Sequence, residues 1–403
     1  MAEPKIRFTN SGTPFPPLTQ HVIGDFTTEH NVRNKKCLPL EIYSVNNQVG
    51  FLPQSEQFDE AGYLNGADTS IYMIAPPNTF AYNPARLDVG SIGYQNVGHD
   101  VQISSLYEVF STNDEIDDTF LWYWFHSEIF KREVFRFQEG GVRQYFYYDK
   151  LEKTPINLPS LDEQKKIAAL FIECDNQIDA QTHKVEALEA RKRGLLQQIF
   201  SQKIRFKADD GSEFDDWEET LLSDVLTERR AKSTGKEEVY SVSVAKGLVN
   251  QIEHLGRSYA AEDTSKYKII CPGDIVYTKS PTGEFKWGIV KQSMIDKNVI
   301  VSPLYGIFIP KYESLGFILD AYFSSSVRAH NYLITQVRKG AKNTINVSND
   351  EFLDNYIMLP TSEDEAKKIK EFILLLNQEI KIEKDKLEAI KNVKKGLLQQ
   401  MFV

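Results

Sequence analysis

Residues 158–171 read LPSLDEQKKIAALF, and the segment that they begin ends at residues 194–200 with GLLQQIF. The same plan returns as LPTSEDEAKKIKEF at 359–372 and as GLLQQMF at 396–402. Between 162–200 and 364–402, 16 of 39 positions are identical. These two segments decide the fold, because each reads as one long helix that begins just after a Leu-Pro pair.

Shorter matches extend the repeat over the whole chain of 403 residues. KIRF at 5–8 recurs at 203–206, and SSLY at 104–107 recurs as SPLY at 302–305. The offset stays between 198 and 202 residues, so the chain is a tandem duplication. The parts before each Leu-Pro pair have diverged far more than the helices, which indicates two halves with a shared scaffold and different contacts.

The apolar residues of both helices step alternately by four and three, a heptad pattern that favours packing of helix against helix. Amphipathic helices on separate domains are the alternative. Ser160 with Glu163, and Ser362 with Glu365, are capping-box candidates. The predicted helix–helix seam consists of Ile167, Phe171, Ile178, Val185, Leu188, Leu195, Ile369, Ile373, Ile380, Leu387, Ile390 and Leu397.

Lysines in the seam predict how the helices run. A parallel pair in register would place Lys192 against Lys394, which is unfavourable in a desolvated layer. An antiparallel pair places Lys192 near Leu376 and Lys394 near Cys174, where each lysine extends past an apolar neighbour. We therefore expect an antiparallel coiled coil, related by a pseudo-two-fold axis. Its helices, at 1.5 Å per residue, would be about 58 Å long.

Four apolar residues lie outside the seam: Leu196, Phe200, Leu398 and Phe402. They are candidates for docking another protein's helices, and packing on the chain's own globular parts is the alternative. The globular parts mix short β-rich runs, such as 269–270, 274–277, 299–301 and 305–309, with helical stretches at 117–132 and 314–328. The predicted fold class is α+β, with two globular domains separated by two long helices.

Composition limits the function classes. The net charge is −10, and residues 1–157 alone carry 12 Lys and Arg against 20 Asp and Glu, so the chain should hold nucleic acid weakly by itself. Three cysteines at separated positions predict neither disulfides nor a metal site. With no apolar run long enough to span a membrane and no signal-like start, we expect a cytoplasmic location.

The sequence contains no phosphate-binding glycine motif and no Asn/Asp-Pro-Pro-aromatic motif, so we expect no catalytic residue and no metal in this chain. A nuclease site could use Asp274 with Glu284 and Lys286, but the motif is short, and Asp274 fits a turn at a strand entry better. A duplicated coiled-coil DNA-binding, adaptor or nuclease protein is the alternative function.

The order of a variable domain, LPSLDEQKKIA, a long helix and GLLQQ(I/M)F, repeated twice, resembles the specificity subunit of Type I restriction–modification systems. CPGDIVYTKSPTG at 271–283 and KGAKNTI at 339–345 also fit that family, whereas APPNTFAYNPARLDVGSIG at 75–93 departs from it. The resemblance implies target recognition domains at 1–157 and 203–358, and spacer helices at 158–202 and 359–403.

The same resemblance implies partners and cofactors. Each globular domain would read one half of a split site in double-stranded DNA. Two methyltransferase subunits, which use S-adenosylmethionine, would dock on the helices. Restriction subunits, which use ATP and Mg²⁺, would join them, and this chain would bind no cofactor itself.

Candidate DNA contacts lie mainly in two glycine-led loops, 141–144 and 340–343, just before the long helices. Glycine permits close approach of the backbone, while basic and amide side chains suit guanine and adenine edges. A solvated turn is the alternative. The candidates are Arg143, Gln144, Tyr145, Arg86, Lys279, Lys286, Lys342, Asn343 and Thr344.

Replacing Arg143 by alanine should weaken recognition of one half-site only, and Lys342→Ala the other. Loss of a base contact should cost about 1–3 kcal/mol, whereas loss of a phosphate contact should weaken binding to all sequences alike. Binding and methylation by the assembled complex at several salt concentrations measure this. If both variants match the parent, the loops are structural turns.

Overall fold

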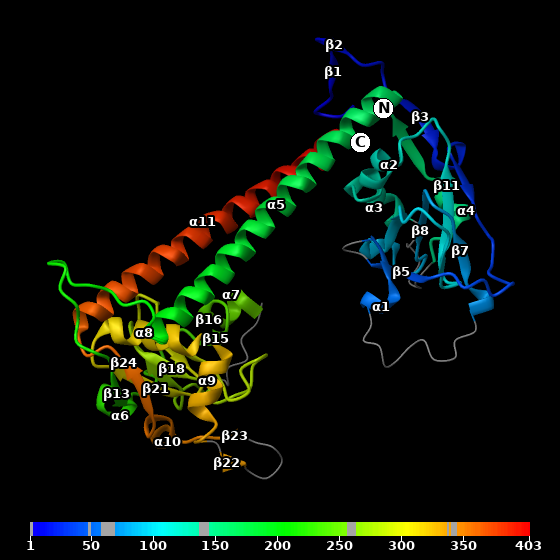
Figure 1. Ribbon diagram of the computed structural model, residues 1–403. Coiled ribbons are helices and arrows are strands. Elements are labelled where there is room, and N and C mark those ends of the chain that lie inside the picture. Colours follow the sequence, from blue (N-terminus) through cyan, green and yellow to red (C-terminus); the bar gives the residue numbers. More distant parts are fainter. Residues whose placement is uncertain are drawn as a thin grey trace. The chain divides into compact units, whose positions relative to one another are not determined.

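The computed structural model describes residues 3–46, 50–57, 69–136, 145–255, 263–336, 338–339 and 345–403. It divides into two compact units (Figure 1). Unit 1 consists of Met1–His183 and Asp385–Val403, and unit 2 is Lys184–Lys384. The predicted domain boundaries, after residues 157, 202 and 358, leave each long helix whole. The two units instead divide each long helix between them.

Unit 1 is built from short strands and short helices around an aromatic core. One sheet has the order β4-β11-β8-β9, and a second has the order β6-β5-β10-β7. Strand β3 pairs antiparallel with β12, which leads directly into the first long helix. Its elements are β1 (Thr9–Asn10), β2 (Thr13–Pro14), β3 (Thr19–Val22), β4 (Thr27–Glu29), β5 (Ile42–Asn46), β6 (Gly50–Pro53), α1 (Gln54–Gln57), β7 (Met73–Ala75), β8 (Thr79–Tyr82), β9 (Ile92–Gln95), β10 (Val101–Ile103), β11 (Glu108–Thr112), α2 (Asp118–Phe125), α3 (Glu128–Arg136), α4 (Tyr148–Leu151) and β12 (Pro155–Leu158).

Unit 2 repeats this plan. Its sheet β14-β21-β18-β19 corresponds to β4-β11-β8-β9, and the pair β13 with β24 corresponds to β3 with β12. Its elements are β13 (Glu218–Leu221), α6 (Leu222–Val225), β14 (Leu226–Glu228), β15 (Tyr240–Ser243), β16 (Gly247–Asn250), α7 (Gln251–Leu255), β17 (Lys268–Ile270), β18 (Ile275–Tyr277), β19 (Val290–Gln292), β20 (Val299–Val301), β21 (Gly306–Pro310), α8 (Glu313–Phe323), α9 (Ser326–Leu333), β22 (Arg338–Lys339), β23 (Ile345–Asn346), α10 (Asn349–Leu353) and β24 (Tyr356–Leu359).

A serine ends each predicted helical stretch earlier than expected and starts a second helix. The stretch 117–132 is α2 followed by α3, and the hydroxyl of Ser127 accepts a hydrogen bond from the backbone N–H of Phe130. The stretch 314–328 is α8 followed by α9, and Ser325 accepts from Arg328 in the same way. Serine favours this capping position because its hydroxyl satisfies an otherwise unpaired N–H.

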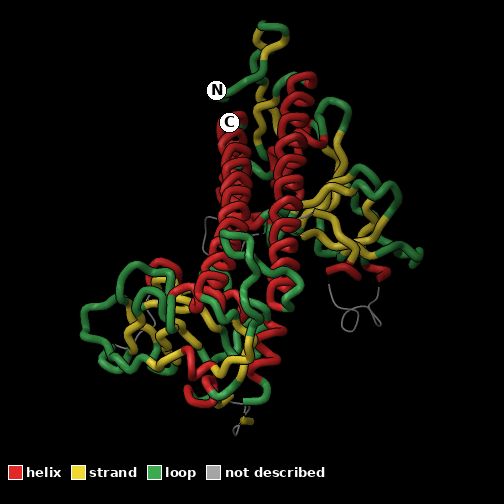
Figure 2. Tube along the Cα trace, turned by 60° about the vertical axis from the view of Figure 1, so that its left-hand side comes forward, coloured by secondary structure: helices red, strands yellow, loops and turns green. Residues whose placement is uncertain are grey.

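The two long helices are α5 (Leu161–Phe200) and α11 (Glu363–Met401). In each unit a segment of α5 lies alongside a segment of α11 (Figure 2). In unit 1, Phe171 stacks on Phe402 at 5.9 Å between ring centroids, and Asp175, one turn later, is hydrogen-bonded to Lys394. Residue numbers rise along one helix as they fall along the other, so the predicted antiparallel pairing is confirmed.

The segments of the two helices in unit 2 run antiparallel as well. Lys184 Nζ lies 3.1 Å from Glu383 Oε2, and Lys192, two turns later, lines a cavity with Ile373 and Asn377. Both seam lysines therefore sit beside the positions expected for them, displaced by about one residue along the partner helix.

The twelve predicted seam residues are all buried or partly buried. Glu383 is buried among them, and its ion pair with Lys184 compensates for the loss of water around the carboxylate. At Glu383, where a polar residue interrupts the apolar heptad pattern, the helices are therefore joined by a salt bridge.

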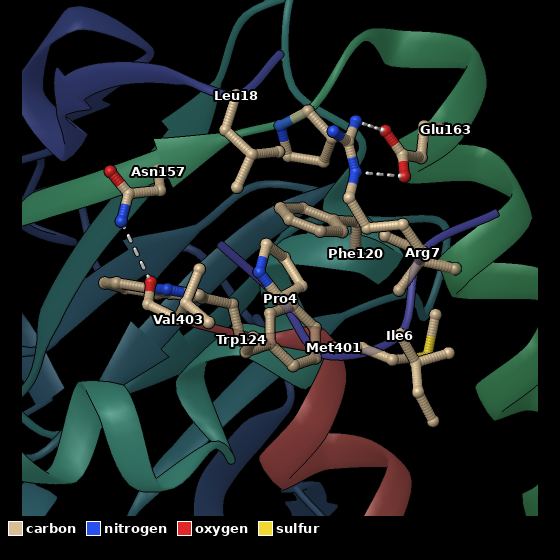
Figure 3. A pocket seen from close by; sticks show the side chains of 13 residues that line it. Pro4, Ile6, Arg7, Leu18, Phe120, Trp124, Asn157, Glu163, Met401 and Val403 are labelled. Carbon is tan, nitrogen blue, oxygen red and sulfur yellow. Dashed lines mark hydrogen bonds and ion pairs between the residues drawn. The ribbon is translucent and has the colours of Figure 1, made fainter. Parts of the chain in front are cut away.

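A buried salt bridge, here called the Arg–Glu clamp, fixes the start of each long helix. In unit 1, Arg7 donates from Nε and Nη2 to Glu163 at 3.1 and 2.6 Å (Figure 3). Glu163 is 1% exposed, so its charge needs this partner. Nearby, Asn157 Nδ2 donates to the carbonyl oxygen of Val403 at 3.1 Å, which ties the end of α11 to β12.

Unit 2 carries the second copy of the clamp. Arg205 donates from Nε to Glu365 at 2.8 Å and from Nη2 at 3.2 Å, and Glu365 is fully buried. Trp217 adds a third donor, because its Nε1 lies 3.0 Å from Glu365 Oε2. The repeated KIRF motif thus supplies the arginine that neutralises the first turn of its own long helix.

The predicted capping boxes are wrong because the clamp uses the glutamates. Ser160 Oγ is buried without a hydrogen-bond partner among the described residues. Ser362 Oγ accepts from the N–H groups of Asp364 and Glu365, at 3.2 and 3.5 Å, so only the serine half of a box is present there. Both carboxylates turn instead toward arginine, which neutralises them better than a backbone N–H does.

The two clamps offer a matched comparison. Arg7→Met should cost about 3–5 kcal/mol, because it strands a buried carboxylate, and Arg205→Met should cost less, because Trp217 still donates to Glu365. Urea unfolding followed by circular dichroism measures both. The double variant Arg7→Met/Glu163→Met should recover most of the loss; equal losses in the two single variants, with no recovery, would contradict this account.

Candidate nucleic-acid interface

Equivalent connections in the two units carry predicted DNA-contacting cations. Arg86 lies in the connection between β8 and β9, and its side chain is exposed. Lys279 and Lys286 lie in the corresponding connection between β18 and β19. Lys286 is exposed, while Lys279 is partly buried. The sequence prediction thus places a cation at the end of the same central strand in both units.

Lys279 lies at the start of the connection between β18 and β19, where the backbone is closely packed. Its backbone has a φ of +59°, a left-handed conformation that a side chain rarely adopts. Gly288 faces it across the loop, and a Cβ atom there would lie 2.8 Å from the Lys279 nitrogen. Thr278 N–H donates to the Ile289 carbonyl at 3.0 Å, which closes the base. Strain of this kind is characteristic of positions under functional constraint.

The charge around Lys279 is also unusual. Burial, followed by the nearby charge of Lys268, lowers the pKa of Lys279. Lys268 Nζ donates to the carbonyl oxygen of Tyr305 at 2.6 Å. Two lysines therefore share one region of unit 2, which suits an anionic ligand such as a phosphate.

Unit 1 brings two of the predicted segments together. The N–H of Phe146 donates to the Pro84 carbonyl at 3.0 Å, which joins the segment of Tyr145 to the loop of Arg86. Tyr145 and Tyr147 are 50% and 48% exposed and stack at 5.4 Å between ring centroids. Exposed, stacked aromatic rings form a surface that could contact sugar or base faces.

The remaining loop candidates, Arg143, Gln144, Lys342, Asn343 and Thr344, lie outside the described residues. Their role stays a prediction from the sequence.

Asp274 has a structural role that accounts for its burial. Arg229 donates to both of its carboxylate oxygens, at 2.5 and 3.0 Å, and the N–H of Cys271 donates at 2.8 Å. This is the strand-entry turn that the sequence predicts. In the described part of the chain, no three His, Cys, Asp or Glu residues are grouped where they could hold a metal ion.

Known proteins resemble this chain in both sequence and fold. The family model of the Type I restriction modification DNA specificity domain matches residues 61–190. A Type I restriction enzyme specificity subunit (MjaVIII) of Methanocaldococcus jannaschii is 26% identical over 322 residues, which cover 74% of this chain and 72% of the relative. In sequence, the chain is thus similar to Type I restriction–modification specificity subunits.

Solved structures of specificity subunits share the fold. The S subunit of a Type I restriction–modification system from M. genitalium has a TM-score of 0.52 at 12% identity, over 100% of this chain and 99% of that one. A chain from a study of complex assembly and conformational transition in the type I R–M system has a TM-score of 0.59 at 12% identity, over 96% and 97%. At such low identity, the likeness concerns the fold alone.

The residues predicted to dock partner subunits pack instead on the chain's own cores. Leu196 and Phe402 are 4% exposed, in the cores of units 2 and 1 respectively, so the docking prediction is wrong for them. Phe200 and Leu398 are partly buried against the same two cores. The helix ends are apolar because they close the globular parts.

No helix in the described ranges has the length and apolar character needed to cross a membrane.

A pair of carboxyl groups distinguishes unit 1 from unit 2. Burial, then the charge of Glu29 and a hydrogen bond with it, raise the pKa of Glu108 to about 7. Tyr82, directly opposite Glu108 in the sheet, has a buried hydroxyl with no partner among the described residues. Gly306 takes the place of Glu108 in unit 2, opposite Tyr277. No local pattern in the sequence indicates this pair, because 79 residues separate its members.

The raised pKa of Glu108 predicts a pH-dependent stability. Protonated Glu108 stabilises the fold fully below its ordinary pKa near 4.5, and this contribution is lost as the pH rises through about 7. Glu108 is only half buried, so the effect on Tm should be modest, roughly 1–3 °C. Thermal unfolding from pH 5 to 8 should show a steeper decline for the parent than for Glu108→Gln. Glu29→Gln should flatten the profile in part, and parallel profiles would contradict the assignment.

Proposed function

We propose that this chain reads a two-part sequence in double-stranded DNA, with one half-site for each globular part. In this proposal it is the specificity subunit of a Type I restriction–modification complex. The observation that carries the proposal is the duplicated sheet. The same strands in the same register lead into connections that bear different cations, Arg86 in one unit and Lys279 and Lys286 in the other.

Two globular parts with the same fold but different side chains suit a DNA site whose two halves differ in sequence. Unit 1 adds exposed Tyr145 and Tyr147 and the Glu29–Glu108 pair near its candidate surface, whereas unit 2 adds Lys268. Side chains that differ at matching positions would read different base edges, because the major groove presents a distinct pattern for each base pair.

We propose further that the chain is not catalytic and holds no cofactor. This rests on the sequence, which lacks phosphate-binding glycine motifs and the Asn/Asp-Pro-Pro-aromatic motif. Methyltransferase partners would supply S-adenosylmethionine, and restriction subunits would supply ATP and Mg²⁺. A chain with a net charge of −10 would depend on such partners for much of its affinity for phosphates.

Reconstitution tests this function. The chain, mixed with the methyltransferase encoded beside it, should form a complex that methylates a split DNA site, while the purified chain alone incorporates no labelled methyl group. Methyl transfer by the chain alone, abolished by substituting one of its own polar residues, would overturn the non-catalytic assignment.

The helix pair should set the length of the spacer between the half-sites. A duplicate of 177–183 inserted after His183, and one of 378–384 inserted after Lys384, adds a heptad to each helix and keeps the seam in register. Seven residues add about 10 Å of helix. The spacer should therefore lengthen by about three base pairs, at about 3.4 Å each, with both half-sites unchanged.

Sequencing of methylated sites from a random library measures the spacer. The control is the insertion in α5 alone, which breaks the seam register and should impair assembly. A changed half-site with an unchanged spacer would show that the helices do not act as a ruler.

A further inference from the structure

The two seam lysines, equivalent by duplication, have different surroundings. In unit 1, Lys394 is ion-paired with Asp175, whose other oxygen accepts from the Tyr123 hydroxyl at 2.7 Å. Lys394 also lies over the Tyr123 ring, at 5.2 Å from its centroid. The charge of Lys394 is therefore neutralised by Asp175, and the Tyr123 ring packs against it.

Unit 2 lacks this arrangement at Lys192. The repeat offset places Asn377 where unit 1 has Asp175, so the carboxylate is missing. The capping serines Ser127 and Ser325 align α2 with α8, which places Ala321 at the position of Tyr123. By the same alignment, Asp320 and Ser324 replace the larger Trp122 and His126.

These smaller side chains leave a cavity of about 390 Å³ in unit 2. Lys192, Asp320, Ala321, Ser324 and Asn377 all line it, so the cavity lies at the positions where unit 1 carries Trp122, Tyr123 and His126. Its volume falls within the range of small-ligand sites.

The cavity carries an excess of positive charge. Lys192, Lys246 and Lys291 line it, against the single carboxylate of Asp320. That carboxylate is already bound, since Lys291 Nζ lies 3.1 Å from one oxygen and the N–H of Gln292 donates to the other at 2.9 Å. No described residue forms an ion pair or hydrogen bond with the Lys192 side chain, and burial, followed by the charge of Lys291, lowers its pKa.

Apolar side chains, among them Phe317, Ile373 and Met294, also line the cavity. An unpaired, partly buried lysine is costly without a counter-anion. Two excess positive charges match a phosphate monoester, which carries about −1.5 to −2 at neutral pH. We propose that this cavity binds a small organic phosphate monoester, with its phosphate at Lys192 and Lys246 and its organic body against Phe317 and Ile373.

The inference is independent of the proposed DNA recognition. The ligand would contact α5 and α11 through Lys192 and Ile373, and the turn between β15 and β16 through Lys246. Its binding would therefore stabilise the attachment of unit 2's globular part to its helix segments.

Phenyl phosphate and inorganic phosphate serve as probes for the full chain, with phenol as the neutral control. Phenyl phosphate at roughly 10 mM should raise Tm by about 2–4 °C, inorganic phosphate less, and phenol not at all. Calorimetry should give a weaker Kd for inorganic phosphate, because it leaves the apolar wall empty. No shift with either phosphate would overturn the proposal.

Two variants assign the site. Lys192→Met should weaken phenyl phosphate binding by about tenfold or more. Asn377→Asp restores the ion pair of unit 1, so it should raise Tm without ligand and abolish the ligand-induced shift. The matched control is Lys394→Met in unit 1, which should leave binding unchanged. Full binding by Asn377→Asp, or a loss in Lys394→Met equal to that in Lys192→Met, would place the probe elsewhere and refute the assignment.

Discussion

A buried carboxylate in the first turn of each long helix constrains the rest of the molecule. Glu163 and Glu365 are almost wholly shielded from water, so each must meet a cation in the folded state. Arg7 and Arg205 meet that requirement from segments that precede their own globular parts. Each salt bridge thereby holds the KIRF segment against the first turn of the long helix and the strand that leads into it. The position of the globular part on its helix depends on this contact.

The duplication made much of the fold predictable from the sequence. A heptad spacing over about 40 residues strongly favours packing of one helix against the other. Lys192 and Lys394 indicate that the two helices run antiparallel, because a parallel pair would place these like charges together. The short strands β17, β18, β20 and β21 fall within one or two residues of the apolar runs that indicate them. Local signals, which depend on neighbours in the chain, were thus sufficient.

The rest depended on contacts between distant residues. Nothing local pairs Arg7 with Glu163, 156 residues away, so Glu163 resembled a capping residue. Leu196 and Phe402 carry the same apolar signal whether they face a partner or the chain's own core. The cavity beside Lys192 arises from a difference in side-chain volume between two helices, which becomes visible only when the two units are compared.

The division of the helices also bears on how the chain folds during synthesis. Unit 2 is a continuous stretch, Lys184–Lys384, so all of it is synthesised before the second segment of unit 1, Asp385–Val403. Unit 1 is discontinuous, and its core includes Met401 and Phe402. Domains commonly fold from the N-terminus onward during translation. Here the first domain in sequence is the last to complete its core, because Met401 and Phe402 are synthesised after the whole of unit 2.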